Sequence, residues 1–295
     1  MSVKGRIVTD MIRFFTAQKM LGPKIQDGTL RKNLVEAPWH CPEEYINLPI
    51  HMRQFEMELL TPKEEDCGEV ILQLHGGGYI AKIRNAYRDF AVRYSRIKGY
   101  RVLSVDYRVA PEHPYPAATE DAMKAWNYLM LLGYGARDVI ITGDSAGGNL
   151  ALSLVLKLKE QERLLPRGIV LMSPWTDLTS EGKTFQTKAE LDPVLDKEYI
   201  DRMTKAYAPA MDLTDPYISP LYGDFHGFPP VYIQVGENEI LLDDSLRLYK
   251  NLIKAGVSAH IDRFPGMWHV FQMSPFKKAN EAMDKNAEFI YSVCR

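Results

Sequence analysis

Cysteine is scarce in this chain, which contains only Cys41, Cys67 and Cys294. An odd number of widely spaced cysteines forms neither a disulfide framework nor the ligand pattern of a zinc site. Free thiols are typical of proteins that fold in the reducing cytosol. We therefore expect a cytoplasmic protein that binds no metal.

Long apolar runs and a dominant charge are absent as well. No stretch approaches the roughly 18 apolar residues that a membrane span needs, and the first residues lack the cleavage pattern of a signal peptide. The formal net charge of −2 gives no basic surface of the kind that binds nucleic acid. Hydrophobic residues nevertheless make up 46% of the chain, enough for a substantial core. We expect a soluble protein with no nucleic-acid or membrane partner.

Short apolar runs recur from Arg53 onward, each ending in a polar or glycine-rich loop, and helical patterns lie between them. This alternation predicts an α/β fold, with a mostly parallel sheet covered by helices on both faces. We expect one domain over residues 1–295, with its ligand crevice beyond the carboxyl ends of the strands. The expected strands lie within QFEMELLTP, EVILQLHGG, YRVLSVDYR, DVIITGDS, GIVLMSPW, PVYIQVGEN and AHIDRFPG. The expected helices span residues 85–98, 119–132, 146–163, 243–255 and 274 to the C-terminus.

Two segments interrupt the alternation. In the first, Ile7, Met11 and Phe14 have near-helical spacing, and an irregular proline-rich stretch follows them. In the second, a charged insert contains the helical pattern DKEYIDRMTKAY. We expect the two segments, about 1–50 and 181–216, to form a helical cap over the crevice. The alternative is two unrelated surface decorations.

The central motif is G-x-S-x-G, in which Ser145 lies between Gly143 and Gly147. The apolar run DVIIT precedes it and a helical pattern follows. A serine on a tight strand-to-helix turn exposes its hydroxyl to substrate, and the glycines permit the strained turn. We predict that Ser145 is a nucleophile; the alternative is a structural turn serine.

Three glycines follow His75 at the end of the run EVILQL. Acyl transfer builds negative charge on the carbonyl oxygen, which fixed backbone N–H groups can stabilise. We predict an oxyanion hole formed by Gly77, Gly78 and Ala146, the residue after the nucleophile. A phosphate-binding loop is disfavoured because no G-K-[ST] follows the glycines. We interpret His75 as a structural residue that shapes this loop.

A serine nucleophile needs a histidine as its general base. In enzymes with this serine turn, an acid and then a histidine follow the serine along the chain. His260 falls inside an expected strand, whereas His269 falls on the loop PGMWH beyond it. We therefore predict that His269 is the base.

The acid should lie on the loop after the strand VYIQV, where Glu237, Glu239, Asp243 and Asp244 are candidates. A buried carboxylate there would orient the imidazole and stabilise its cation. Asp243 and Asp244 stand where a helix should begin, so we interpret them as N-cap and first-turn residues. Glu239 is the predicted acid.

These residues carry a resemblance to the bacterial hormone-sensitive-lipase-like family of α/β hydrolases. The blocks HGGGY, DYRVAPEHPYPAATEDA, GDSAGGNLA, SPWTDL, DPYISPLYGD and PGMWHVF resemble those of the family, from about Ile71 to the C-terminus. The family's acid usually begins a D-P-L-x-D pattern, which here matches the stretch from Glu239 to Asp243. The first 70 residues match weakly. The resemblance implies an α/β-hydrolase fold with a helical cap, and it allows a homodimer.

The remaining blocks concern the surroundings of the site. The block that runs from Asp106 to Pro114 should brace the loop of the oxyanion glycines. Asp144, beside the nucleophile, should stabilise the turn. Tyr79 and Trp175 follow strand ends and either line a substrate pocket or belong to the core.

Together these features predict a serine carboxylester hydrolase that uses an acyl-enzyme and no cofactor. The resemblance implies small uncharged esters with short to medium acyl chains. A lactone, carbamate or amide could be cleaved by the same triad, and a lipase that acts at lipid surfaces is another alternative. A ligand-binding protein on a hydrolase scaffold, as in the plant gibberellin receptors, is disfavoured because those receptors lack the histidine that this chain has at His269.

Overall fold

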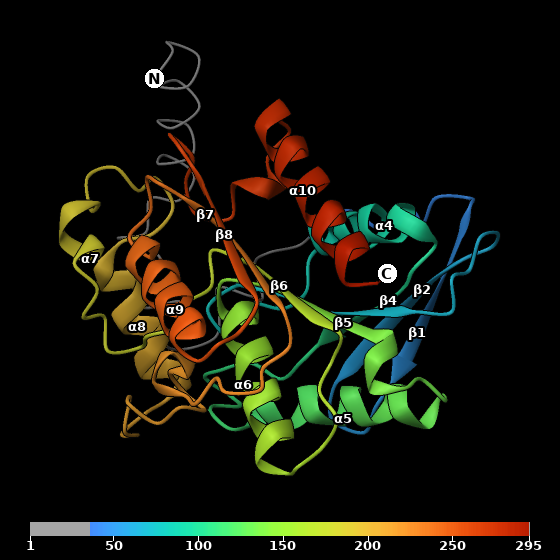
Figure 1. The fold of residues 1–295 in the computed structure, drawn as a ribbon, viewed down its shortest axis with the longest axis horizontal. Coiled ribbons are helices and arrows are strands. Elements are labelled where there is room, and N and C mark those ends of the chain that lie inside the picture. The colour runs from blue at the N-terminus through green and yellow to red at the C-terminus, as the bar shows by residue number, and fades with distance from the viewer. Residues whose placement is uncertain (1–35, 295) are drawn as a thin grey trace.

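A twisted sheet of eight strands runs through the computed structural model, which describes residues 36–294 (Figure 1). The strands are β1 (Tyr45–His51), β2 (Glu56–Pro62), β3 (Val70–Leu74), β4 (Arg101–Asp106), β5 (Val139–Asp144), β6 (Gly168–Met172), β7 (Val231–Gly236) and β8 (Ala259–Phe264). Their order across the sheet is β1-β2-β4-β3-β5-β6-β7-β8. The pairs β1–β2 and β2–β4 are antiparallel, and all the others are parallel. The mostly parallel sheet predicted from the alternation is confirmed.

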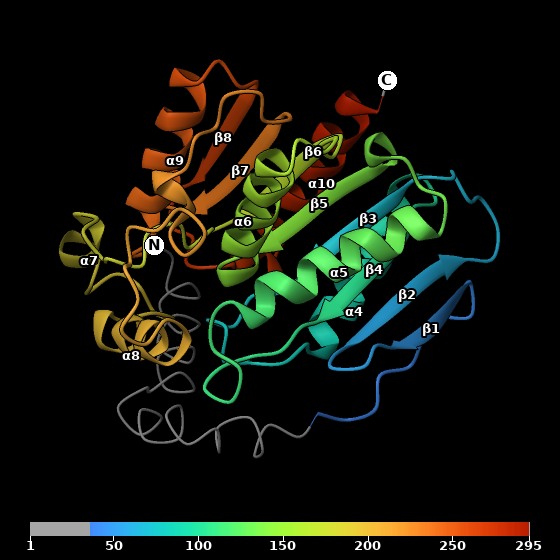
Figure 2. The same ribbon diagram turned by 90° about the horizontal axis from the view of Figure 1, so that it is seen from below.

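Helices cover both faces of this sheet. They are α4 (Asn85–Lys98), α5 (Ala117–Leu131), α6 (Ala146–Glu160), α7 (Thr184–Thr187), α8 (Lys197–Tyr207), α9 (Leu242–Lys254) and α10 (Lys277–Val293). Helices α5, α6 and α9 lie on one face, whereas α4 and α10 lie on the other (Figures 1 and 2). Two parallel neighbours can be joined only by a segment that crosses one face of the sheet, and helices form most of these crossover segments.

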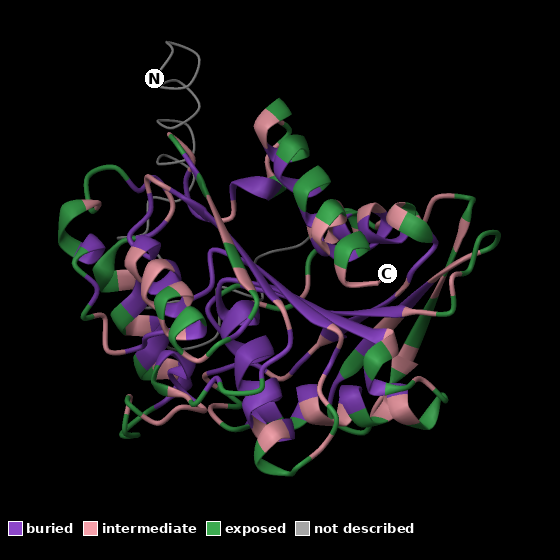
Figure 3. Ribbon diagram, viewed as in Figure 1, coloured by how far each residue is buried: buried purple, intermediate pink, exposed green. Residues whose placement is uncertain are grey.

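Alternate side chains of the central strands feed two separate cores. In β3, Val70, Leu72 and Leu74 face the core beneath α5 and α6, whereas Ile71 faces the core beneath α4 and α10. All four are fully buried, and the central strands of Figure 3 are buried along their length. Each such side chain contributes about 1.5–3 kcal/mol on burial. The two-sided core explains why these strands are continuous apolar runs rather than alternating ones.

The predicted elements agree with the structure within a few residues, with one exception. Helix α4 has the predicted bounds and ends at Gly99, whose φ of 76° is the left-handed conformation of a C-cap. Strand β1, however, lies within a stretch that the sequence predicted to be irregular. Its residues form an edge of the sheet, so residues 45–50 of the segment predicted as a cap belong to a strand. The predicted N-terminal helix lies outside the described residues.

The charged insert stands apart from the helix layers. Helices α7 and α8 lie together beyond one end of the sheet (Figure 2). The predicted helix in the insert is confirmed as α8, and the side chain of Asp196 caps it by accepting a hydrogen bond from the Tyr199 N–H at 2.8 Å. Among the helices of residues 36–294, none is long and apolar enough to cross a membrane.

Candidate active site

Ser145 occupies a strained turn between β5 and α6. Its backbone has φ 50° and ψ −119°, a combination that residues other than glycine rarely adopt. A Cβ atom on Gly143 would lie 2.3 Å from the Gly147 carbonyl oxygen, and one on Gly147 would lie 2.1 Å from the Leu74 carbonyl oxygen. Only glycine fits at either position, which lets the start of α6 pack closely against the end of β3. The turn predicted from the motif is therefore present.

The glycine loop lies next to this turn because β3 and β5 are parallel neighbours whose ends meet at one edge of the sheet. Gly77 and Gly78 have φ angles of 103° and 61°. A Cβ atom on Gly77 would lie 2.7 Å from the Ala81 Cβ, and one on Gly78 would lie 1.8 Å from the Met203 Sδ in α8. The loop thus needs glycine, and the insert packs directly on it. Ala146, fully buried, begins α6, whose first N–H groups have no partner within the helix.

His75, the residue before the glycine loop, is held in place by contacts with Tyr107. Its ring stacks on Tyr107, with centroids 4.1 Å apart and planes 4° from parallel. The Tyr107 hydroxyl donates a hydrogen bond of 2.6 Å to the His75 carbonyl oxygen. Burial lowers the pKa of His75 to about 4, against the charge of Asp106, which raises it. A neutral ring held in this way fits the structural role that the sequence predicted for His75 and for the block that contains Tyr107.

Asp144 links the nucleophile turn to the same loop. Its carboxylate accepts hydrogen bonds from the Gly76 N–H and from the Tyr87 hydroxyl, each at 3.0 Å. Burial raises the pKa of Asp144 to about 6, although the Tyr87 hydroxyl and the charge of His269 lower it. Both contacts stabilise the turn, as the sequence predicted for this residue.

Glu239 and His269 meet at the carboxyl ends of β7 and β8. The Glu239 Oε2 lies 3.0 Å from the His269 Nδ1, and both side chains are buried. The other carboxylate oxygen accepts hydrogen bonds from the Gly236 N–H at 2.6 Å and from the Ser173 hydroxyl at 2.9 Å. The carboxylate is therefore fixed by three donors, one of which is the imidazole.

The charge environment of His269 favours its protonated form. Burial lowers the pKa of the ring, but the hydrogen bond and charge of Glu239, followed by the charges of Asp192 and Asp144, outweigh burial and raise the pKa above its ordinary value. A base that gains a proton more readily in this setting can accept one from a nearby hydroxyl. The imidazolium would then be stabilised by Glu239.

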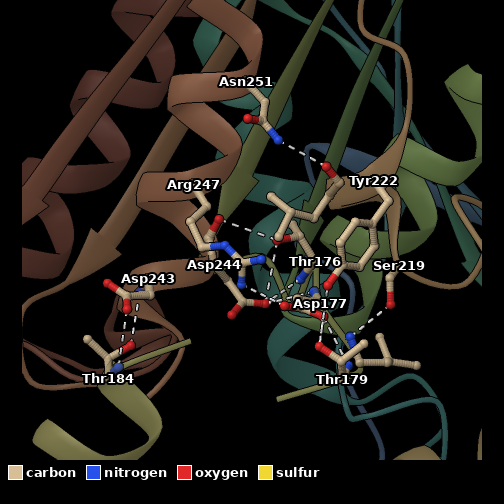
Figure 4. Close-up of polar contacts among 12 residues, drawn as sticks. Thr176, Asp177, Thr179, Thr184, Ser219, Tyr222, Asp243, Asp244, Arg247 and Asn251 are labelled. Carbon is tan, nitrogen blue, oxygen red and sulfur yellow. Dashed lines mark hydrogen bonds and ion pairs between the residues drawn. The ribbon is translucent and has the colours of Figure 1, made fainter. Parts of the chain in front are cut away.

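The other acid candidates have other partners: Glu237 forms an ion pair of 2.8 Å with Arg263, and Figure 4 shows the contacts of Asp243 and Asp244. Asp243 accepts a hydrogen bond from the Thr184 N–H at 3.3 Å. The fully buried Asp244 accepts hydrogen bonds from the N–H groups of Thr176 and Asp177 at 2.8 and 2.9 Å. Both lie in the first turn of α9, as predicted, but neither is its N-cap, which is Leu241. Both carboxylates instead accept hydrogen bonds from residues far away in the sequence. Asp243 contacts the insert, and Asp244 contacts the loop that follows β6 (the β6 loop).

Tyr79 and Trp175, the two pocket candidates, are both fully buried. Tyr79 stacks on Tyr207 of α8, with ring centroids 3.7 Å apart. Its hydroxyl donates a hydrogen bond of 2.7 Å to Asn149. These contacts of Tyr79 are those of a core aromatic, and a role for either residue in lining the substrate pocket stays a prediction.

Sequence reasoning missed Ser173, which bridges the acid and base loops. Its hydroxyl donates to Glu239 and accepts a hydrogen bond of 3.2 Å from the Val270 N–H, next to His269. Its position directly after β6, at the edge that carries the other candidates, was the available signal. Serine is common after strands, however, and the sequence does not show that this one contacts Glu239 and Val270.

Known proteins resemble this chain along most of its length. A family model described as "alpha/beta hydrolase fold" matches residues 71–273. An esterase from Acinetobacter venetianus is 38% identical over 228 residues, which cover 76% of this chain and 75% of that protein. A crystal structure of EstE5 soaked with p-nitrophenyl butyrate has a TM-score of 0.90 at 29% identity and covers 99% of each chain. An esterase from the bacterial hormone-sensitive lipase family has a TM-score of 0.87 at 31% identity, over 98% of this chain and 97% of that one.

Proposed function

The chain belongs to the bacterial hormone-sensitive-lipase family of α/β hydrolases, and on that premise we propose that it hydrolyses carboxylic esters through Ser145, His269 and Glu239. The observation that carries the proposal is the buried contact of 3.0 Å between Glu239 and His269, at the sheet edge where Ser145 occupies its strained turn. These are the base, the orienting acid and the nucleophile that acyl transfer needs.

In this reaction the Ser145 hydroxyl oxygen attacks the ester carbonyl carbon while its proton passes to Nε2 of His269. The N–H groups of Gly77, Gly78 and Ala146 stabilise the negative charge that develops on the carbonyl oxygen. The bond to the alcohol then breaks, and His269 protonates the leaving oxygen. Water attacks the acyl-enzyme with His269 again as base, which releases the acid and restores Ser145.

A cap formed by the N-terminal region and residues 181–216 would select the substrate. Support comes from the insert: Met203 of α8 packs on Gly78, and Tyr207 of α8 stacks on Tyr79. A helix that lies against the oxyanion glycines restricts the space for the acyl and alcohol groups. Short to medium uncharged esters fit this arrangement, and the ester in which EstE5 was soaked has a butyryl chain.

A panel of p-nitrophenyl esters from acetyl to palmitoyl, together with a lactone and an emulsified triglyceride, tests the proposal. We expect the highest kcat/KM among the short and medium esters, and a loss of roughly a million-fold in kcat for Ser145→Ala purified in the same way. Turnover by Ser145→Ala within tenfold of the unmodified enzyme would refute the role of Ser145. A kcat/KM that is highest for the lactone or the emulsion would replace the ester assignment.

A further inference from the structure

We propose that Asp192, in the insert, is a positioning residue for the acid and the base of the site, an inference that rests on the proposed function. Asp192 is buried, with 6% of its surface exposed, in a segment that is otherwise rich in exposed charged side chains. A buried carboxylate needs partners that compensate for the lost water. Its partners connect the insert to the loop of Glu239.

The two oxygens of Asp192 bind two different segments. One accepts hydrogen bonds from the N–H groups of Val194 and Leu195, at 2.8 and 3.0 Å, and so closes a turn within the insert. The other accepts a hydrogen bond of 2.8 Å from the N–H of Ile240, the residue directly after Glu239. The insert therefore holds the backbone from which the acid projects.

The same carboxylate acts on the base through its charge. Three carboxylates raise the pKa of His269, namely Glu239, Asp192 and Asp144. Burial raises the pKa of Asp192 itself to about 6, against the charge of His269 and its backbone donors, which lower it. The two charges act on each other, since His269 lowers the pKa of Asp192 and Asp192 raises the pKa of His269. The negative charge of Asp192 thus stabilises the imidazolium that forms during the reaction.

The sign of the effect follows from these charges. Hydrolysis needs neutral His269 to accept the proton, so kcat/KM rises with pH through the pKa of that ring. A neutral residue at position 192 removes one of the anions and lowers this pKa. The acid limb of the pH profile should then move to lower pH. Separately, the loop that carries Glu239 loses its hydrogen bond to residue 192, which should lower kcat on the plateau.

The test compares Asp192→Asn with Asp196→Asn, a matched control that removes a carboxylate from the same insert. Asp196 caps α8 and is exposed, so solvent screens its charge. For Asp192→Asn we expect kcat to fall roughly tenfold to a hundredfold with a smaller change in KM, and the acid limb of kcat/KM to shift down by about one pH unit. Asp196→Asn should leave the limb in place and change the melting temperature little, because asparagine caps a helix about as well as aspartate.

Asp192→Glu keeps the charge but moves the acceptors, so we expect its plateau to fall without a shift of the limb. This variant also serves if Asp192→Asn does not fold. An unshifted limb in Asp192→Asn, or a limb that shifts to lower pH in Asp192→Glu, would overturn the proposal.

NMR of histidine labelled with 13C at Cε1, assigned with His269→Gln, separates this inference from the proposed function. It measures the pKa of His269 without turnover, and we expect Asp192→Asn to lower that pKa by the same amount as the limb. An inactive enzyme in which the pKa still falls would refute the esterase and leave the charge effect intact. An active enzyme in which the pKa does not change would refute the role of Asp192 alone.

Discussion

Oε2 of Glu239 lies 3.0 Å from Nδ1 of His269, across 30 residues of chain that contain one helix and one strand. Both groups are buried, so the contact is screened little by solvent. Spacing along the chain does not distinguish Glu239 from Asp243, four residues later. The structure separates them by their partners, since Asp243 contacts Thr184 of the insert.

Replacing Glu239 by glutamine should keep the fold and lower kcat by roughly three to four orders of magnitude. The imidazolium loses its charged partner, and the amide no longer selects the required tautomer. Asp243→Asn is the control and should cost about 1 kcal/mol of stability or less, because it weakens only the hydrogen bond from the Thr184 N–H. The measurements are kcat with a short-chain nitrophenyl ester and the melting temperature of each variant. Loss of turnover in Asp243→Asn, with Glu239→Gln still active, would identify Asp243 as the acid.

Replacing Gly77 by valine should reduce kcat by on the order of a hundredfold or more, with a smaller change in KM. The new side chain meets Ala81 and strains a backbone with φ 103°, which displaces the N–H donors. Gly133→Val is a suitable control, because Gly133 has φ 94° and open space around it. Steady-state kinetics of both variants test the idea. A Gly77→Val enzyme with normal kcat and raised KM would show that the loop only binds substrate.

Asp244 should make the folded protein less stable as pH rises. Burial and the negative charge of Asp177 raise its pKa to about 8, although its hydrogen bonds and the charge of Arg247 lower it. A carboxyl whose pKa is raised on folding contributes stability that is complete below its unfolded pKa of about 3.9 and is lost as pH rises through about 8. Asp244→Asn removes this proton exchange and keeps the shape of the side chain.

Between pH 5 and pH 8, the free energy of unfolding of the unmodified protein should therefore fall relative to that of Asp244→Asn. The difference between the two should change by at most about 1.4 kcal/mol per pH unit. Urea titrations at several pH values measure the difference, with Asp243→Asn as a control in the same helical turn. Parallel pH profiles for Asp244→Asn and the unmodified protein would show that Asp244 is ionised throughout.

Local sequence patterns were sufficient for the sheet, most of the helices and the turn at Ser145, because glycine positions and apolar runs determine these features directly. Strand β1 was missed because Pro49 lies within it, and proline argues against a strand except at a sheet edge. The roles of Ser173, Asp192 and Asp244 depend on partners far away in the sequence. No local pattern reveals such contacts, so an N-cap was predicted where a buried carboxylate binds the β6 loop.

Covalent labelling tests the central claim most directly. A fluorophosphonate forms a bond from phosphorus to an activated serine oxygen and releases fluoride, so it marks the nucleophile without any assumption about the substrate. Mass spectrometry should find one label per chain, on Ser145 within the tryptic peptide Asp138–Lys157, with ester hydrolysis lost in proportion. Ser145→Ala should take up no label. A label on another residue, or full ester hydrolysis by the labelled enzyme, would contradict the account.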